Sequence, residues 1–553
     1  MRNPLRVLPV HWLLVAGVAV AMAVPGAVVV TTTATTTAAH TSSSTPDGTT
    51  AAQASVGHIG APTIVHPQVS AQPYQPTQAQ LAARADAMAG LAKHVAPSMG
   101  QHTTLADVQG SGGPETGTSA QAAGTFTQLR KSLINSTCSG CGQSSINEPS
   151  VANNGKFIVE TSNWNIAYST TGGVGTTPWL NQNPYAFSSG FCCDQMVTYV
   201  PSRNIFLLLQ LDYAGEGNAN NGLALSVASG KTPTSWCTYK FSGAIGGGAT
   251  STPDFPKIAV ANNNAYLTWN EYPPNAGFAR SGLARMPLDS LAACAGFSYS
   301  FLTRTTEFTF ALSQAPSSLN TFYWVSNWFL DGTTNGSNMR IFTWAENSGT
   351  YFANTRAINA YTFGNASCGS PNWCSRLDPR WESVVITNAQ YRAQANSAFA
   401  GDSILEVATS AGPSGFSNGK NYVVYNYFKL NSLTYIGNDQ TYSTSTNFAY
   451  PGCAVNAAGY VGCAMADGTN VPGGLILLQD DVNPTQPWGF SFNVPGVSGA
   501  TGWGDYVVTS PWNPGVGPFQ TVLWQMNGST VQPYYIVWGR GKDLNGFNRW
   551  KNS

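Results

Sequence analysis

The sequence predicts an all-β protein: a single β-propeller, with about seven four-stranded blades, that follows a disordered N-terminal region with one short helix. Three observations favour this class: 12% aromatic residues, 57 Gly with 33 Pro, and a degenerate repeat over residues 140–545. Aromatic side chains suit half-buried strands, and Gly and Pro suit the turns between them. One sheet cannot bury both of its faces alone, so radial stacking is expected. Two β-sandwiches are the rival, but no linker-like break interrupts the repeat.

The repeat has two landmarks. The first is an acidic or polar residue that begins an alternating apolar strand and is followed by a second strand-like run. Its copies begin at Glu148, Asp194, Asp254, Ser318, Arg380, Tyr450 and Asp505. The run that follows Arg380 is expected at 390–394. The second landmark is a Ser placed ten residues before a Trp, at Ser169 and again at Ser226, and the Trp is expected to wedge between neighbouring sheets.

The first 27 residues read as a signal peptide. Arg2 and Arg6 form a positive start, residues 12–24 are apolar, and small residues near 21–27 offer a cleavage site. An uncleaved membrane anchor is the alternative, because the apolar run extends close to the length of a membrane span. Cleavage would leave no membrane span in the mature chain.

Residues 28–125 have the composition of a low-complexity linker or pro-segment, rich in Thr, Ala, Ser and Pro. Near 78–95, apolar residues recur every three or four positions, which predicts a helix. This helix belongs to a pro-segment or packs on the domain that follows. The propeller domain is expected to occupy 126–553.

Charge and histidine content exclude several functions. The chain has 25 Lys+Arg, 25 Asp+Glu and only 9% charged residues, so it lacks the basic surface that nucleic acids or anionic membranes require. All six histidines precede residue 103. A domain that begins after about residue 125 would therefore have no imidazole for a Ser-His-Asp triad or a His-ligated zinc.

Ten cysteines in an exported chain favour disulfides. Proximity in sequence suggests the pairs Cys138–Cys141, Cys237–Cys294, Cys368–Cys374 and Cys453–Cys463. Cys192 and Cys193 are adjacent, so they form a vicinal disulfide or each pairs elsewhere.

Three segments resemble the sialidase-like β-propellers that carry BNR, or Asp-box, repeats: 148–153, 502–507 and 169–179. The last is similar to an Asp-box without its Asp and with a longer spacing from Ser169 to Trp179. The resemblance covers about 400 residues and implies the propeller fold rather than an activity. Sialidases clamp a carboxylate with three arginines; Arg380 is one candidate for such a residue, and the full catalytic set has no counterpart here.

In a propeller the starts of the inner strands converge on the mouth of the central channel. The candidate catalytic residues are therefore Glu148, Asp194, Asp254 and Asp505, and the candidate substrate-binding residues are Arg380, Glu382 and Trp503. Paired carboxylates can cleave glycosidic bonds, and the same oxygens are candidate Ca²⁺ ligands, although no cofactor is required. The structural alternative is that each carboxylate orders a turn at a strand start.

Three function classes remain open. The first is a secreted, monomeric propeller that binds a glycan or a surface partner at the channel mouth. The second is a carboxylate-dependent glycoside hydrolase or lyase. The third is a structural or adhesion module displayed on a stalk.

Overall fold

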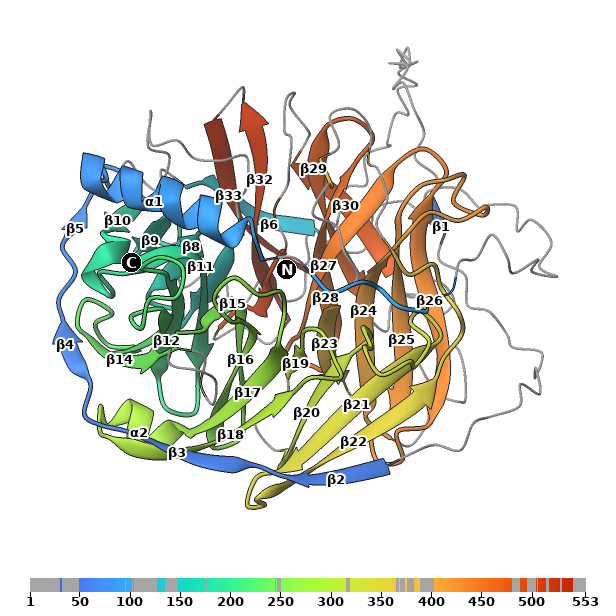
Figure 1. Cartoon of the computed structure of the whole chain (residues 1–553). Helices are drawn as coiled ribbons and strands as arrows, with labels where there is room; N and C mark the ends of the chain where they lie inside the picture. Colours follow the sequence, from blue (N-terminus) through green and yellow to red (C-terminus); the bar gives the residue numbers. More distant parts are fainter. Residues whose placement is uncertain are drawn as a thin grey trace, which may run out of the picture.

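The computed structural model is nearly all-β, which confirms the predicted class (Figure 1). The helices among the described residues are α1 (Gln78–Leu91), α2 (Leu288–Ala292) and one 3₁₀ turn, Pro184–Ala186. Within the described part of the chain, no helix is long and apolar enough to cross a membrane. The structure describes residues 30–31, 49–94, 96–101, 103, 127–134, 148–174, 178–243, 245, 250–314, 319–364, 368, 373–374, 382–387, 402–479, 488–494, 504, 506–513, 517–527 and 530–540.

Consecutive strands pair antiparallel in sets of four, as the repeat predicts. Alternating apolar residues in each strand place side chains on both faces of its sheet, where neighbouring sheets cover them. The first three sets are β7 (Ser150–Asn153), β8 (Ile158–Ser162), β9 (Asn165–Ser169) and β10 (Leu180–Gln182); β11 (Phe191–Val200), β12 (Ile205–Asp212), β13 (Gly222–Ser229) and β14 (Trp236–Ser242); β15 (Thr252–Ala261), β16 (Asn264–Tyr272), β17 (Arg280–Pro287) and β18 (Phe297–Arg304).

The later sets repeat this pattern, and a short parallel pairing of β19 with β23 joins two of them. In the final set the fourth strand is β6 (Thr127–Leu133), which precedes β7 in the chain and pairs with β33. These sets are β19 (Ala311–Gln314), β20 (Thr321–Ser326), β21 (Asn338–Ala345) and β22 (Thr350–Ala357); β23 (Glu382–Thr387), β24 (Ile404–Ala411), β25 (Tyr422–Lys429) and β26 (Tyr435–Ser443); β27 (Asn447–Val455), β28 (Val461–Gly468), β29 (Pro472–Gln479) and β30 (Trp488–Val494); β31 (Thr509–Pro511), β32 (Phe519–Asn527) and β33 (Thr530–Gly539).

The first strands of successive sheets contact one another in order around a common centre, giving a propeller-like arrangement (Figure 1). β7 contacts β11, and the series continues through β15, β19, β23, β27 and β31, which contacts β7 again. Tryptophans fill the junctions between sheets, as expected. Trp179 of the first set packs edge-on against Tyr535 of the last, with ring centroids 5.6 Å apart.

Two details of the repeat were predicted wrongly. The copy expected at Ser318 is not a first strand, because β20 follows β19 in its sheet and is the second strand. The second strand of the set that begins with β23 is β24, Ile404–Ala411, and not 390–394, which lies outside the described residues.

The N-terminal segment pairs with the outer edges of the sheets and is not a free linker over its described residues. β2 (Thr49–Gln53) joins β22, β3 (Ser55–Ile59) joins β18, β4 (Thr63–Val65) joins β14 and β5 (Val69–Ser70) joins β10. Farther upstream, β1 (Val30–Thr31) pairs with β26. The N-terminal strands therefore meet the sheets in the reverse of their order along the chain.

Helix α1 begins with a capping box between Thr77 and Gln80 and lies along one end of the first two sheets (Figure 1). Arg84 anchors it: the guanidinium carbon lies 4.3 Å from the centre of the Trp164 ring, and Nε donates a 3.1 Å hydrogen bond to the Tyr185 hydroxyl. Gly90 faces Tyr213 so closely that any larger side chain would collide with the tyrosine. The helix is thus packed against side chains of the sheets and is not an isolated, solvent-exposed helix.

Four disulfides are present among the described residues, and each joins a pair named from the sequence. Cys138 and Cys141 lie outside the described residues. Such cross-links are typical of proteins from oxidising compartments. The bonds are Cys192–Cys193, Cys237–Cys294, Cys368–Cys374 and Cys453–Cys463.

Candidate functional site

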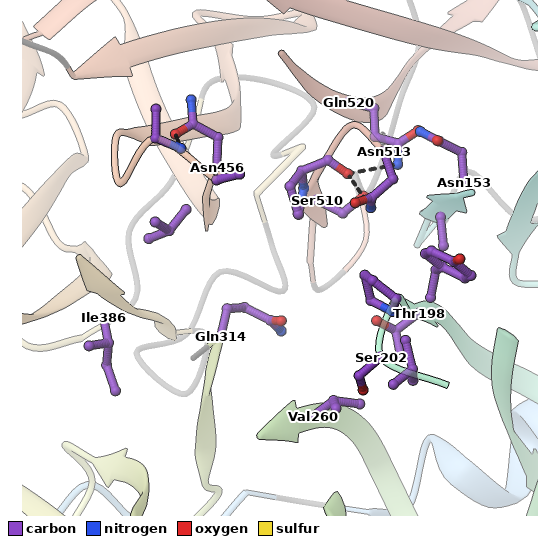
Figure 2. Close-up of a pocket in the computed structure, with 18 of the residues that line it drawn as sticks. Asn153, Thr198, Ser202, Val260, Gln314, Ile386, Asn456, Ser510, Asn513 and Gln520 are labelled. Carbon is purple, nitrogen blue, oxygen red and sulfur yellow. Dashed lines mark hydrogen bonds between the residues drawn. The ribbon is translucent and has the colours of Figure 1, made fainter. Parts of the chain in front are cut away.

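A cavity of about 510 Å³ lies where the first strands end and turn into the second strands (Figure 2). Its volume is within the range of small-molecule sites, roughly 300–1,000 Å³. Residues from each of the seven first strands, or from the turns after them, line it. The polar lining residues are Asn153, Thr198, Tyr199, Ser202, Asn262, Gln314, Asn456, Ser510, Asn513 and Gln520.

The lining contains no charged side chain among the residues that the structure describes. Carboxamides and hydroxyls provide its polarity, and each carboxamide can both donate and accept hydrogen bonds. Val260, Ile386 and Val455 supply apolar surface, and Tyr199 is the one aromatic side chain among the described lining residues. The cavity is therefore suited to an uncharged ligand with both polar and apolar faces.

Hydrogen bonds fix one side of this cavity. Asn153 Nδ2 donates to Gln520 Oε1 at 2.7 Å, and the Tyr535 hydroxyl donates to the same oxygen at 2.9 Å. Gln520 Nε2 and Asn513 Nδ2 both donate to the Pro511 carbonyl, at 3.2 and 3.4 Å. These contacts hold the amides in place before any ligand arrives, so their ordering costs no entropy on binding.

Gln314 differs from these fixed amides. It ends β19 and projects toward the middle of the cavity (Figure 2). Its side-chain amide makes no hydrogen bond to any other described residue. It is therefore the side chain best placed to exchange hydrogen bonds with a ligand.

The cavity is adjacent to a narrower space of about 50 Å³ between the first strands, and Gln314 lines both. Lys257 and Ser383 line the narrow part. Lys257 is 5% exposed, and its amino group lies 4.5 Å from the centre of the Phe255 ring. Only a small group could enter here.

The predicted carboxylates lie at the opposite end of the first strands. Glu148 precedes β7, Asp194 is near the start of β11 and Asp254 near the start of β15. These three strands are neighbours, so the residues share one end of the sheets, but none of them lines the cavity. Asp505, Arg380 and Trp503 lie outside the described residues, as does the side chain of Glu382, the first residue of β23.

A histidine reaches this end, contrary to the expectation that the domain lacks imidazole. His94 follows helix α1, and its Nδ1 lies 3.1 Å from Asp254 Oδ2. The expectation failed because it placed the start of the folded unit after residue 125. The N-terminal segment instead crosses the sheets and brings His94 to a residue 160 positions later.

Three second strands carry buried carboxyls opposite the first residues of the first strands. Burial raises the pKa of Glu160 to about 8, that of Asp467 to about 7 and that of Asp212 to about 6. Ser162 donates to Glu160 at 2.9 Å, which opposes the effect of burial in part. Among the described residues, no group of three or more His, Cys, Asp or Glu side chains is placed to hold a metal ion.

The lining amides were not predicted from the sequence, because these residues are uncharged and lie at the ends of the first strands rather than at their starts. A signal was present, since Asn recurs where a first strand ends, at Asn153, Asn262 and Asn456. Asn456 shows its structural role: its Oδ1 accepts from the backbone N–H groups of Ala458 and Tyr460, both at 3.0 Å. Asn153 and Asn456 accept backbone hydrogen bonds that order these turns, and each leaves an amide at this end of the sheets.

No protein-family model matches the chain, and no curated protein matches it in sequence. Solved structures match at low identity. The α-L-arabinofuranosidase Arb93A from Fusarium graminearum has a TM-score of 0.39 and 8% identity over 76% of this chain and 99% of its own. The WD40 domain of SCAP from fission yeast gives 0.35 and 9%, over 75% and 95%. A family PL25 ulvan lyase gives 0.34 and 10%, over 62% and 79%.

Proposed function

We propose that the chain is an exported, seven-bladed β-propeller that binds the uncharged end of a glycan in the amide-lined cavity. The blade count rests on the sets of four strands and on the ring of first-strand contacts. Pairing of β6 with β33 would close the ring, because it joins a strand before the first blade to the last sheet. The signal peptide predicted at residues 1–27 and the four disulfides support export.

The observation that carries the binding function is the uncharged, amide-rich lining. A sugar hydroxyl donates one hydrogen bond and accepts others, so carboxamides such as Gln314 and Asn513 match it without a charge. Val260, Ile386 and Val455 can cover the C–H faces of a sugar ring. A charged ligand would lose its hydration here and gain no countercharge from the described lining residues.

This lining disfavours sialidase chemistry at the cavity, because none of the described lining residues is an arginine that could hold a sialic acid carboxylate. The described candidate carboxylates lie at the other end of the strands and not in the cavity lining. A carboxylate-dependent glycosidase would need two such groups beside its ligand. The cavity is therefore assigned binding and not cleavage.

The test is a glycan array that presents neutral and acidic oligosaccharides to the full chain, followed by calorimetry on the glycans that bind. Gln314→Leu is expected to weaken binding about tenfold or more, since it removes hydrogen bonds worth about 1–3 kcal/mol and keeps a similar size. Gln440→Leu is the matched control, on the outer strand β26 and away from the cavity.

Three results would overturn the proposal. One is binding of acidic glycans only. A second is equal loss of affinity in both variants. The third is release of smaller sugars from bound glycans, which would instead favour the carboxylate-dependent enzyme. Binding to a cell surface without any glycan ligand would point to the adhesion module.

A further inference from the structure

The contact between His94 and the third sheet has the geometry of a bound ligand. The imidazole lies flat on the Tyr272 ring, with centroids 4.2 Å apart and an angle of 2° between the planes. Its Nδ1 is 3.1 Å from Asp254 Oδ2. The His94 side chain is 4% exposed, so the ring is almost fully enclosed.

The two receiving residues come from the sheet and are held there independently of His94. Tyr272 ends β16, and Asp254 lies in β15, the strand that pairs with β16. Asp254 Oδ1 accepts a 2.8 Å hydrogen bond from the Phe255 backbone N–H, which orients the carboxylate. Phe255 has φ +52°, an uncommon conformation for a non-glycine residue that the β-bulge at this point maintains.

The hydrogen bonding selects one form of the imidazole. A carboxylate can only accept hydrogen bonds, so in a hydrogen bond to the Asp254 carboxylate the donor is the N–H of His94 Nδ1. His94 Nε2 is buried and makes no hydrogen bond to any described residue. Two features of the histidine side chain therefore make the contact: its flat ring, which stacks on Tyr272, and one N–H donor, which bonds to Asp254.

The histidine belongs to a segment that is connected to the sheets through separate contacts on either side. Before it, α1 rests on Trp164 through Arg84. After it, Asn335 exchanges backbone hydrogen bonds with Gln101 and Thr103, both at 3.0 Å. The ring is thus one of several points at which the described residues between 78 and 103 contact this end of the sheets.

We propose that Tyr272 and Asp254 form a second binding site, specific for a planar nitrogen heterocycle with an N–H donor, and that His94 fills it as an internal ligand. Tyr272 is the stacking platform and Asp254 is the acceptor that fixes the ring's orientation. Displacement of residues 78–94 would open the site to an external ring of the same chemistry. The site is separate from the amide-lined cavity and does not depend on the function proposed for it.

The experiment replaces the internal ring with a free one. His94→Gly in the full chain leaves a ring-sized space, and imidazole is the probe. Imidazole is expected to raise the unfolding midpoint of His94→Gly in a saturable way and to leave the wild-type midpoint unchanged. The apparent affinity for imidazole, obtained from how the midpoint rises with imidazole concentration, should be at least tenfold weaker in the double variant His94→Gly/Asp254→Asn than in His94→Gly. Benzene-shaped probes without an N–H, such as toluene, should give no comparable rise.

A folded His94→Gly variant without an imidazole-dependent shift would overturn the proposal, as would a shift that survives Asp254→Asn unchanged. If His94→Gly does not fold, a double-mutant cycle of His94→Phe and Asp254→Asn tests the same contact without a cavity. His94→Phe keeps the stacked ring and removes the donor. A coupling indistinguishable from zero in that cycle would also overturn the site.

Discussion

Asn153 and Gln520 are 367 residues apart in the chain, yet the amide of one donates a 2.7 Å hydrogen bond to the amide oxygen of the other. Asn153 ends the first strand of the first sheet, and Gln520 lies in β32 of the last sheet. Both side chains are fully buried. This contact joins the two ends of the ring of strands and forms part of the cavity wall.

Asn153→Asp tests how much this junction contributes to stability. The substitution keeps the shape and places an acceptor opposite the Gln520 oxygen, so we expect a loss of about 1–3 kcal/mol in the free energy of unfolding. Chemical denaturation measures it. Asn263→Asp is the control, because exposed Asn263 uses its Oδ1 to accept from Arg203 and an aspartate keeps that bond. Equal losses in the two variants would contradict the prediction.

Glu160 makes stability depend on pH. Its pKa is about 8 in the folded state and about 4.3 when unfolded, so between these values the folded state holds a proton that the unfolded state has released. Stability therefore falls as pH rises through this window, by about 1.4 kcal/mol per pH unit for this group. Glu160→Gln mimics the protonated form and should be more stable than wild type at pH 8, by on the order of 3 kcal/mol.

Unfolding at pH 5 and at pH 8 checks this expectation. Asp467 and Asp212 also have raised pKa values, so the variant should reduce the slope with pH without abolishing it. A variant with the wild-type slope would mean that Glu160 is ionised in the folded protein.

Arg84 is expected to control the stability of α1 on the sheets. Arg84→Leu keeps an apolar stem, but it removes the cation–π contact with Trp164 and the hydrogen bond to Tyr185. We expect amide hydrogen exchange over 78–91 to accelerate about tenfold, which corresponds to a local loss of about 1–2 kcal/mol. Lys93→Leu, beyond the helix end, is the control. Unchanged exchange in Arg84→Leu would show that the capping box and Gly90 suffice.

Much of the fold was readable because it repeats. The landmarks at Asp194 and Asp254 mark the starts of β11 and β15, since alternating apolar residues specify which face of a strand is buried. The copy at Ser318 misled because β19 is only four residues long, Ala311–Gln314, and carries no acidic landmark. A strand of four residues contains too few apolar–polar alternations to be recognised as a strand from the sequence.

The candidate site was less readable for a different reason. The prediction that equivalent strand positions share one end of the sheets placed Glu148, Asp194 and Asp254 together, but it could not say which end would be hollow. That depends on segments from elsewhere in the chain, and α1 with His94 covers the carboxylate end. The pairing of 49–70 with sheet edges was equally hidden, because exposed side chains on an added edge strand need no apolar pattern.

The reversed order of the N-terminal strands also constrains biosynthesis. A ribosome or a translocation pore releases the N-terminus first, yet β2 cannot pair until β22 at Thr350–Ala357 has emerged, and β6 must wait for β33 at Thr530–Gly539. The backbone groups of the first residues to emerge therefore have no strand partner during most of synthesis or translocation. Long-range pairing of this kind is slow and leaves strands open to wrong partners. Truncation that removes β33 should consequently destabilise β6 first, although β6 is the strand of that sheet most distant in sequence from the C-terminus.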